Sequence, residues 1–524
     1  MTDRTETPEI AVIDQTLVAP AFPPATSVAS PAPPIASSVS PWWRIGDFGV
    51  LGLWIVVVSF TLQYHEKWAD EAQAWLIARD LDLRTIWFHE LRYEGSPGLW
   101  HTILWVAQHV FHAKYGALGY IGMAGATAGA ALLIFEAPFP RYIRWPLAFT
   151  YFMVYQYAVI ARPYTLLPLL AFAAAMLFKD IQHPERMTII LVLLANLSLH
   201  GTILAGCLGL AYLIDGWRCW SELDQRVRKR YWICVAAMVS TFLFIAVILK
   251  PTPDIEEFFL KQQFAQAPQA VKEQMPTVVQ KLTAVTSGAF LDVLVPSILF
   301  IVLAGAWCFS RGKVLTYILP VGAMIAFYGA IHGAAHHHGT AFVAAIAGLW
   351  IAWPSPAEKV AFHKAQRWAL KGMCAMLVCL CVINIWDSEV VIHHEYLYPY
   401  SSAEDAARYL KAVGADKGPM FGFLFGVVAV QAHFDHNIVA NIPTAYFHHG
   451  LPLYGTNLDV SELYRVNPEY IVAYSIEPQL MLENGVPELT SRGYQLVHFS
   501  DGYYLYKRGV FEREAYFILR RTRP

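Results

Sequence analysis

Apolar blocks long enough to cross a lipid bilayer recur along most of this chain and constrain its fold more than any other feature. A membrane-spanning helix needs about 20 mostly apolar residues, because every backbone polar group inside the bilayer must be paired internally. The blocks that reach or approach this length are 48–64, 115–137, 145–160, 164–178, 187–199, 202–215, 232–249, 282–309, 315–331, 340–353 and 372–386. The sequence therefore predicts an all-α polytopic membrane core of about eleven transmembrane helices.

The composition agrees with a membrane protein and gives no sign of a nucleic-acid partner. Of the 524 residues, 56% are hydrophobic and only 15% are charged, whereas soluble domains carry roughly 25% charged residues. The net charge of −2 lacks the basic excess of nucleic-acid-binding proteins. None of the seven cysteines follows Cys381, so a disulfide framework in the tail is excluded.

One further apolar segment, residues 98–112, decides the predicted orientation. If it spans the membrane, the densest basic cluster, residues 226–230, falls outside. If it lies in the membrane interface, this cluster falls on the cytoplasmic side, where Lys and Arg are favoured. We therefore expect an interfacial helix and a cytoplasmic N-terminus. The same rule favours two short helices over one long one in residues 187–215, with His200 in a polar break outside the site.

Three regions follow from this topology. Residues 1–47 are rich in Pro, Ser and Ala and predict a disordered cytoplasmic tail. Residues 48–386 form the transmembrane core, with a large outer loop at 66–115. Block 48–64 has no small-residue cleavage site behind it, so it is interpreted as an anchor. Residues 387–524 then form an extracytoplasmic domain.

The extracytoplasmic domain is expected to be a small α/β domain. Ser401 and Glu404 have the spacing of a capping box at the start of a helix. Short apolar runs follow, as expected for strands, and the last two flank Asp501-Gly502, which predicts a hairpin turn.

An acidic pair opens the first outer loop. Asp70 and Glu71 follow the first apolar block, and Glu94 comes later in the same loop. Ionisable groups beside a membrane are costly and mark functional sites. Consecutive helical residues point roughly 100° apart, so one carboxylate of the pair can face a reaction centre while the other meets a structural partner. Ordinary helix-start acidity, favoured by the macrodipole, is the alternative.

This loop resembles the first outer loop of GT-C-type membrane glycosyltransferases, a superfamily with protein O-mannosyltransferases and lipid A aminoarabinose transferases. The resemblance rests on the stretches DEAQAWLIARD, from Asp70, and YEGSPGLW, from Tyr93. It implies that Asp70 is the general base acting on the acceptor, or a metal-linked orienter of it. Glu71 and Glu94 would contact the acceptor or support those contacts. The metal remains unknown, with a divalent cation near Asp70 left open.

Gly95 departs from the family pattern. Aminoarabinose transferases carry a Lys at this position, and that Lys binds the lipid phosphate, so another group must supply positive charge here. Arg162, with Tyr164 beside it, lies at the outer end of a predicted span, and the family places donor contacts in this second outer loop. A snorkelling interfacial Arg is the alternative. The acidic residue usual in that loop is missing.

A histidine cluster is the second candidate for the donor phosphate. His332, His336, His337 and His338 lie between two predicted spans. Phosphate contact through imidazole N–H groups, a metal site and a solvated loop are the three interpretations. Relatives in the family carry an Arg-His-x-Gly pattern there, which favours phosphate contact by His337 and His338. His336 then takes the place of the Arg.

The resemblance implies an enzyme of the cell envelope. It would be an inverting glycosyltransferase that moves a sugar from a polyprenyl-phosphate donor to a lipid-, glycan- or protein-linked acceptor. The expected location is the inner (cytoplasmic) membrane, in contact with its lipids and with the C-terminal domain in the periplasm. A flippase for lipid-linked glycans would need ionisable residues near mid-membrane and repeat symmetry. A polymerase or ligase with a lipid diphosphate donor would be expected to carry more Arg in its outer loops.

Overall fold

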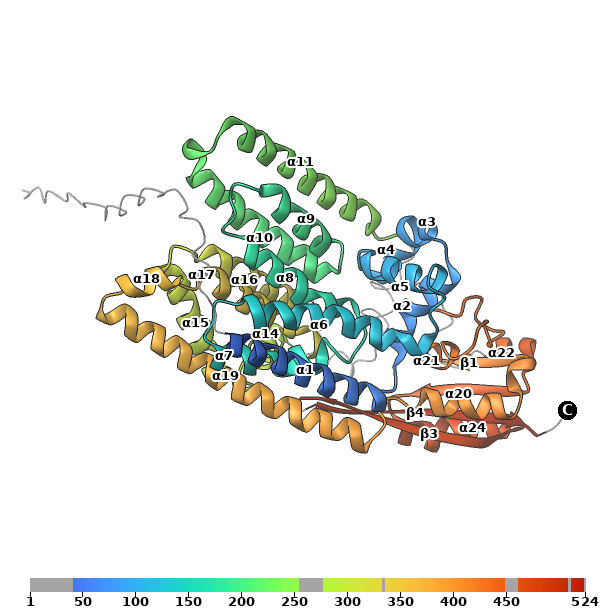
Figure 1. The fold of residues 1–524 in the computed structure, drawn as a ribbon. Helices are drawn as coiled ribbons and strands as arrows, with labels where there is room; N and C mark the ends of the chain where they lie inside the picture. The colour runs from blue at the N-terminus through green and yellow to red at the C-terminus, as the bar shows by residue number, and fades with distance from the viewer. Residues whose placement is uncertain (1–40, 254–276, 332–334, 448–459, 508–509, 523–524) are drawn as a thin grey trace, which may run out of the picture. The chain divides into compact units, whose positions relative to one another are not determined.

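The computed structural model describes residues 41–253, 277–331, 335–447, 460–507 and 510–522 (Figure 1). The chain divides into two compact units, residues 1–46 and 47–524, and the contacts below all lie within the second. Residues 1–40 of the predicted cytoplasmic tail lie outside the described residues. Helix α1 begins at Pro41 and ends at Tyr64.

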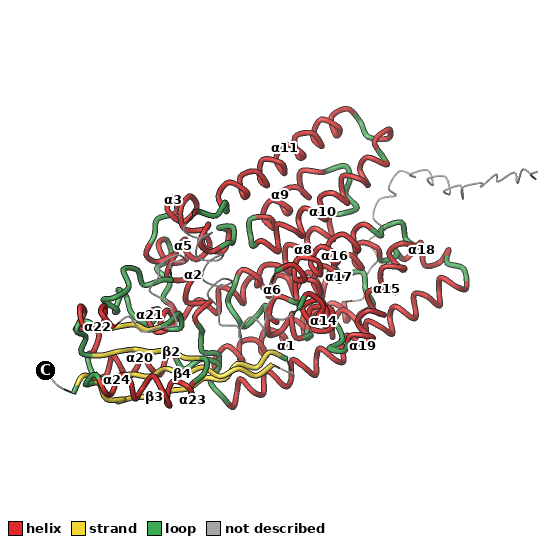
Figure 2. Tube along the Cα trace, turned by 180° about the vertical axis from the view of Figure 1, so that it is seen from behind, coloured by secondary structure: helices red, strands yellow, loops and turns green. Residues whose placement is uncertain are grey.

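Helices make up most of the described chain as far as residue 397 (Figure 2). After α1 they are α2 (Ala69–Asp80), α3 (Leu83–Thr85), α4 (Leu91–Glu94), α5 (Leu99–His109), α6 (Leu118–Glu136), α7 (Arg141–Ala148), α8 (Leu167–Leu177), α9 (Pro184–Ala195), α10 (Leu199–Arg218), α11 (Gln225–Ile248), α14 (Val278–Ala289), α15 (Leu294–Ser310), α16 (Leu315–Ala330), α17 (Gly339–Ala352), α18 (Pro356–Ala361) and α19 (Lys364–Leu397). Short turns η3 (Phe152–Gln156), η4 (Pro163–Leu166) and η7 (Ala335–His337) connect some of them.

The helices have the character of a membrane protein, but the predicted count of eleven spans is wrong. Within the described ranges, five helices are long and apolar enough to cross a bilayer, or six if the bent pair α14 and α15 is one span. The five are Arg44–Tyr64, Tyr115–Glu136, Leu199–Arg218, Gln225–Ile248 and Lys364–Leu397.

The predicted number of spans is too high because an apolar sequence does not distinguish a helix in lipid from a helix buried in protein. Every residue of α17 is buried, and α17 packs against α8 and α16. The block 145–160 is divided between α7 and the turn η3, so neither piece is long enough to span. Residues 187–215 do form parts of two helices, but the break comes at residues 196–198, and His200 lies in the first turn of α10.

The C-terminal domain is α/β, as predicted. Its elements are α20 (Ala403–Ala412), β1 (Met420–Phe423), α21 (Val427–Gln431), α22 (Val460–Val466), β2 (Tyr470–Ser475), α23 (Pro478–Leu480), α24 (Val486–Ser491), β3 (Tyr494–Tyr506) and β4 (Val510–Arg521). The strands form one sheet in the order β1-β2-β4-β3, with β1 parallel to β2 and the other pairs antiparallel. Helices cover both faces. Val472 and Ile518 pack toward α20 and α21, and Ile471 and Phe517 pack toward α22 and α24.

Two local predictions in this domain are wrong. β3 runs straight through Asp501-Gly502, and the strand pairing continues to Tyr506. Gly502 serves close packing instead of a turn, because a Cβ there would lie 2.8 Å from the Cα of Ser401. The expected capping box is also absent, since α20 begins at Ala403 and the hydroxyl of Ser401 donates to Glu514 at 2.5 Å.

Helix α2 joins the domain to the helical core. Ala72, Leu76 and Ile77 of α2 are buried in the same apolar cluster as α20, α21 and one face of the sheet. The side chain of Gln73 donates to the carbonyl of Phe447 at 2.6 Å and accepts its N–H at 2.8 Å. The C-terminal domain therefore packs against helix α2, which carries the acidic pair, and helps to fix its position.

Candidate functional site

The two carboxylates at the start of α2 have different partners. Glu71 is fully buried. One of its oxygens accepts the N–H of Ala161 at 2.7 Å, and the other lies 2.9 Å from Nε2 of His65. Asp70 instead lies 3.0 Å from Nη1 of Arg162, and about a quarter of its side chain is exposed. Asp70 is thus the carboxylate that a ligand can reach, and Glu71 is a structural anchor and not an acceptor contact.

His65 carries the charge that holds Glu71. Its Nδ1 lies 2.9 Å from Glu395, near the end of α19, and Glu395 also accepts the hydroxyl of Tyr155. Burial alone would lower the pKa of His65, but the carboxylates of Glu71 and Glu395 raise the pKa to about 10. Burial would likewise raise the pKa of Glu71, but His65 lowers it. This charged triad ties the end of α1, the start of α2 and the end of α19.

Arg162 connects Asp70 to the histidine cluster. The same Nη1 that meets Asp70 donates to Nε2 of His336 at 2.7 Å. The guanidinium lies over the rings of Trp68 and Tyr164, with its carbon 5.9 and 5.7 Å from the ring centres. Trp68, Asp70, Arg162 and His336 come from three separate chain segments, so the fold assembles this group.

His336 is a neutral donor beside a cation. Burial, and then the positive charge of Arg162, lower the pKa of His336 well below its usual range. Because Nε2 accepts from Arg162, the ring proton is assigned to Nδ1. That Nδ1 is buried and has no hydrogen-bond partner among the residues the structure describes. A buried N–H without a partner is costly, so His336 offers a ready contact for an anion.

His337 and His338, which the sequence favoured for phosphate contact, have other recorded neighbours. The ring of His337 packs on His200 and on Tyr164, with ring centres 5.0 and 5.5 Å apart. His338 precedes α17 and lies against Gly288, where a Cβ would come within 2.6 Å of its Nδ1. His336 is therefore the histidine with a recorded hydrogen bond to Arg162, and phosphate contact by His337 and His338 stays a prediction.

Tyr164 and His200 form a pair behind Arg162. The hydroxyl of Tyr164 lies 3.0 Å from Nδ1 of His200, and both residues are buried. Tyr164 therefore contributes its ring face to Arg162, while its hydroxyl is engaged elsewhere. His200 is a supporting residue of the cluster that the sequence left outside it. His332 lies outside the described residues.

Glu94 lies on the same side of α2 as Asp70. It accepts a hydrogen bond from Gln73 at 2.8 Å, and His101 lies 4.0 Å away. Burial raises the pKa of Glu94 to about 7, with smaller contributions from Glu90 and Asp70 in the same direction, while Gln73 and Arg162 oppose the shift. Glu94 therefore changes charge near neutral pH.

Gly95 ends α4 with φ of +60°. This left-handed conformation favours glycine, so the backbone here is suited to the residue that is present. Positive charge at this site comes from Arg162.

The C-terminal domain contributes an aromatic wall that the sequence analysis missed. The ring of Tyr504 lies 5.5 Å from Trp68, and the ring of Tyr506 lies 6.0 Å from His336. Alternate residues of a strand share a face, so the Tyr-x-Tyr spacing at the end of β3 could have indicated a common surface. It could not have indicated that this surface meets α2.

The described residues do not assemble a metal centre. In the ranges that the structure covers, no three His, Cys, Asp or Glu side chains come together as ligands. One oxygen of Asp70 is already engaged by Arg162. This donor set fits an anion beside Arg162 better than a divalent cation beside Asp70.

Comparison of the chain with protein-family models, with curated proteins and with solved structures gave no match. Function is therefore inferred from the residues of the site.

Proposed function

We propose that the chain is an inverting glycosyltransferase of the GT-C type, which moves a sugar from a polyprenyl-phosphate donor to a lipid-, glycan- or protein-linked acceptor at the outer face of the inner membrane. The observation that carries the proposal is the partly exposed Asp70 paired with Arg162 at 3.0 Å. This pair supports the proposal because a carboxylate able to accept a proton lies beside a cation of the kind that binds phosphate, next to helices of membrane-spanning length.

Each residue of the group has a role in this reaction. An acceptor hydroxyl attacks the anomeric carbon, its proton passes to Asp70, and the bond from that carbon to the phosphate oxygen breaks. The leaving phosphate takes the electron pair and is bound by Arg162 and by the Nδ1–H of His336. Both polar contacts that the structure describes for Arg162 use Nη1, so Nε and Nη2 remain as donors for phosphate oxygens, in the fork that suits them.

The ring of Trp68 suits a sugar above the phosphate. Trp68 is partly exposed beside Arg162 and packs against Tyr504, which is buried and donates its hydroxyl to Glu514. Aromatic rings supply broad apolar contact surfaces with defined geometry.

The decisive experiment replaces Asp70 by Asn. We expect transfer to fall by about 10²–10⁴-fold, the usual contribution of a general base, while donor binding remains. Asp80→Asn is the matched control, because Asp80 is an exposed carboxylate on the same helix and pairs with Arg79. The assay compares lipid-linked and surface glycans of a deletion strain complemented with each variant. Full restoration of the glycan profile by Asp70→Asn would reject the proposal.

The side of the membrane on which the site lies requires a separate experiment. A Cys introduced at Ser96 or at exposed Ser491 should react with a membrane-impermeant thiol reagent in intact spheroplasts. Native Cys219, between α10 and α11 beside the basic cluster, should react only after permeabilisation. Reaction of Cys219 in intact spheroplasts would place the site on the cytoplasmic side.

A further inference from the structure

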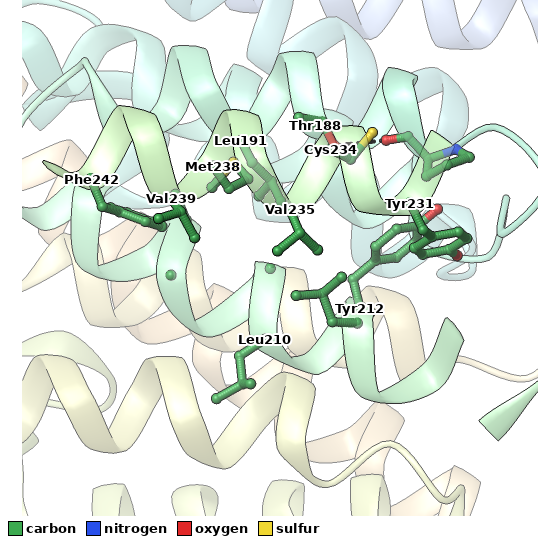
Figure 3. Close-up of a pocket in the computed structure, with 15 residues that line it drawn as sticks. Thr188, Leu191, Leu210, Tyr212, Tyr231, Cys234, Val235, Met238, Val239 and Phe242 are labelled. Carbon is green, nitrogen blue, oxygen red and sulfur yellow. Dashed lines mark hydrogen bonds between the residues drawn. The ribbon is translucent and has the colours of Figure 1, made fainter. Parts of the chain in front are cut away.

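An apolar pocket lies between α9, α10 and α11, away from the residues of the proposed site. Its volume is about 190 Å³. Figure 3 shows side chains from the three helices around it, and its apolar walls include Leu191, Leu210, Val235, Met238, Val239 and Phe242. Nothing in the proposed transfer reaction uses this pocket.

Two glycines of α10 keep the pocket open. A Cβ on Gly206 would lie 3.7 Å from the ring of Phe242, and a Cβ on Gly209 would lie 3.4 Å from Leu191. An alanine would therefore fit at Gly206 in ordinary contact, whereas a larger side chain would project into the space. A cavity with this lining gains little from water, so an apolar occupant is favoured.

The pocket adjoins a surface suited to lipid. Helices α10 and α11 both have the length and apolarity of membrane spans. Leu210 and Val239 line the pocket and are also about half exposed, and Leu243, one turn further along α11, is 63% exposed. Apolar side chains exposed in this way on spanning helices face acyl chains.

One end of the pocket adjoins a cluster of cations. Pro184 and Tyr231 line the pocket, and their chain neighbours include Arg186 and Arg230, which pair with Asp180 and Glu185. Arg226, Arg228 and Lys229 complete the basic start of α11. Asp224 caps this helix, but the four cations in residues 226–230 outnumber Glu222 and Asp224. This end therefore carries an excess of positive charge that a negative headgroup would meet.

We propose that this pocket binds one anionic phospholipid. An acyl chain occupies the space beside Gly206 and Gly209, and the phosphate of the headgroup lies against the basic start of α11. Charge complementarity selects the occupant, because basic residues between or beside membrane helices attract anionic headgroups. The site is independent of the proposed glycosyl transfer.

The test uses full-length protein in detergent, native mass spectrometry, and phosphatidylglycerol and phosphatidylcholine with identical acyl chains. We expect one phosphatidylglycerol to be retained about tenfold more than phosphatidylcholine, a preference of the size that a few basic residues provide. Gly206→Leu should abolish this retention, and Gly206→Ala should keep it. Equal retention of the two lipids, or no effect of Gly206→Leu, would overturn the proposal.

A second variant tests the headgroup contact without altering the pocket. Arg226→Gln combined with Lys229→Gln removes two exposed charges and should reduce the preference for phosphatidylglycerol about tenfold. Lys359→Gln with Lys364→Gln removes the same charge elsewhere and should leave the preference unchanged. The charge variants also decide the question if Gly206→Leu does not fold. Displacement of phosphatidylglycerol by an equimolar polyprenyl phosphate, with higher retention, would assign the pocket to the donor lipid and reject our assignment.

Discussion

The guanidinium of Arg162 and the carboxylate of Asp70 lie 3.0 Å apart, and both side chains remain partly exposed. Their supporting neighbours, Glu71 and His336, are buried. A ligand that approaches this part of the protein therefore meets a paired acid and base on a fixed frame. This arrangement suits an enzyme, because catalytic groups must be held in place by residues that do not themselves move.

Arg162→Lys should weaken donor binding more than it slows turnover. Lys keeps the charge but presents a single point donor in place of a planar fork, and it cannot reach Asp70, His336 and a phosphate together. We expect the Michaelis constant for the polyprenyl-phosphate sugar to rise about tenfold or more, the range for loss of a charged hydrogen bond. Steady-state kinetics on purified protein measure this effect.

Arg162→Ala should raise the Michaelis constant for the donor further than Arg162→Lys does. It should also lower turnover, because Asp70 loses its partner. An unchanged Michaelis constant in both variants would show that Arg162 does not bind the donor.

His336→Asn should weaken donor binding, whereas His337→Asn should not. Nδ1 of His336 is buried and unpaired among the described residues, while His337 packs against His200 and Tyr164. We expect a higher Michaelis constant for the donor with His336→Asn, and a lower unfolding temperature at an unchanged constant with His337→Asn. Donor titrations and thermal unfolding separate the two effects, and equal constants for both variants would refute the assignment to His336.

Local helical geometry could be predicted from the sequence, but long-range assembly could not. The separation of Asp70 from Glu71 follows from the helical repeat alone. The number of spans does not, because α17 is as apolar as a spanning helix and yet is buried on all sides. The hairpin turn predicted at Gly502 does not form. This glycine instead allows close packing against the backbone of another segment. The contact of Tyr504 with Trp68 depends on how the domain docks onto α2, which no local pattern encodes.

The activity should rise with pH through about 7 because of Glu94, whose pKa burial raises to about 7. Below this pH Glu94 is neutral, and above it Glu94 adds a negative charge near Asp70, which favours removal of a proton from the acceptor. We expect kcat/KM of the wild type to increase through this range and Glu94→Gln to lack the increase. His101 is the control. Burial lowers its pKa to about 4, so His101→Asn should keep the increase.

The triad of His65, Glu71 and Glu395 should make stability depend on pH. The folded pKa of His65 is about 10, above its ordinary value of 6.5. The stabilisation is therefore fully present below about pH 6.5, and it is lost progressively as the pH rises from there to about 10. We expect the unfolding temperature of the wild type to fall over this range, and that of His65→Gln to start lower and change less.

A double variant shows whether this effect belongs to the His65–Glu71 pair. His65→Gln leaves two buried carboxylates without their cation, and breaking a buried pair in this way costs about 3–5 kcal/mol. Adding Glu71→Gln removes one of those uncompensated charges, so the two changes together should cost less than the sum of their separate effects. Thermal unfolding in detergent, followed by tryptophan fluorescence from pH 6 to 10, measures both quantities. Strict additivity, with the same pH dependence in wild type and His65→Gln, would show that the imidazolium does not hold the start of α2.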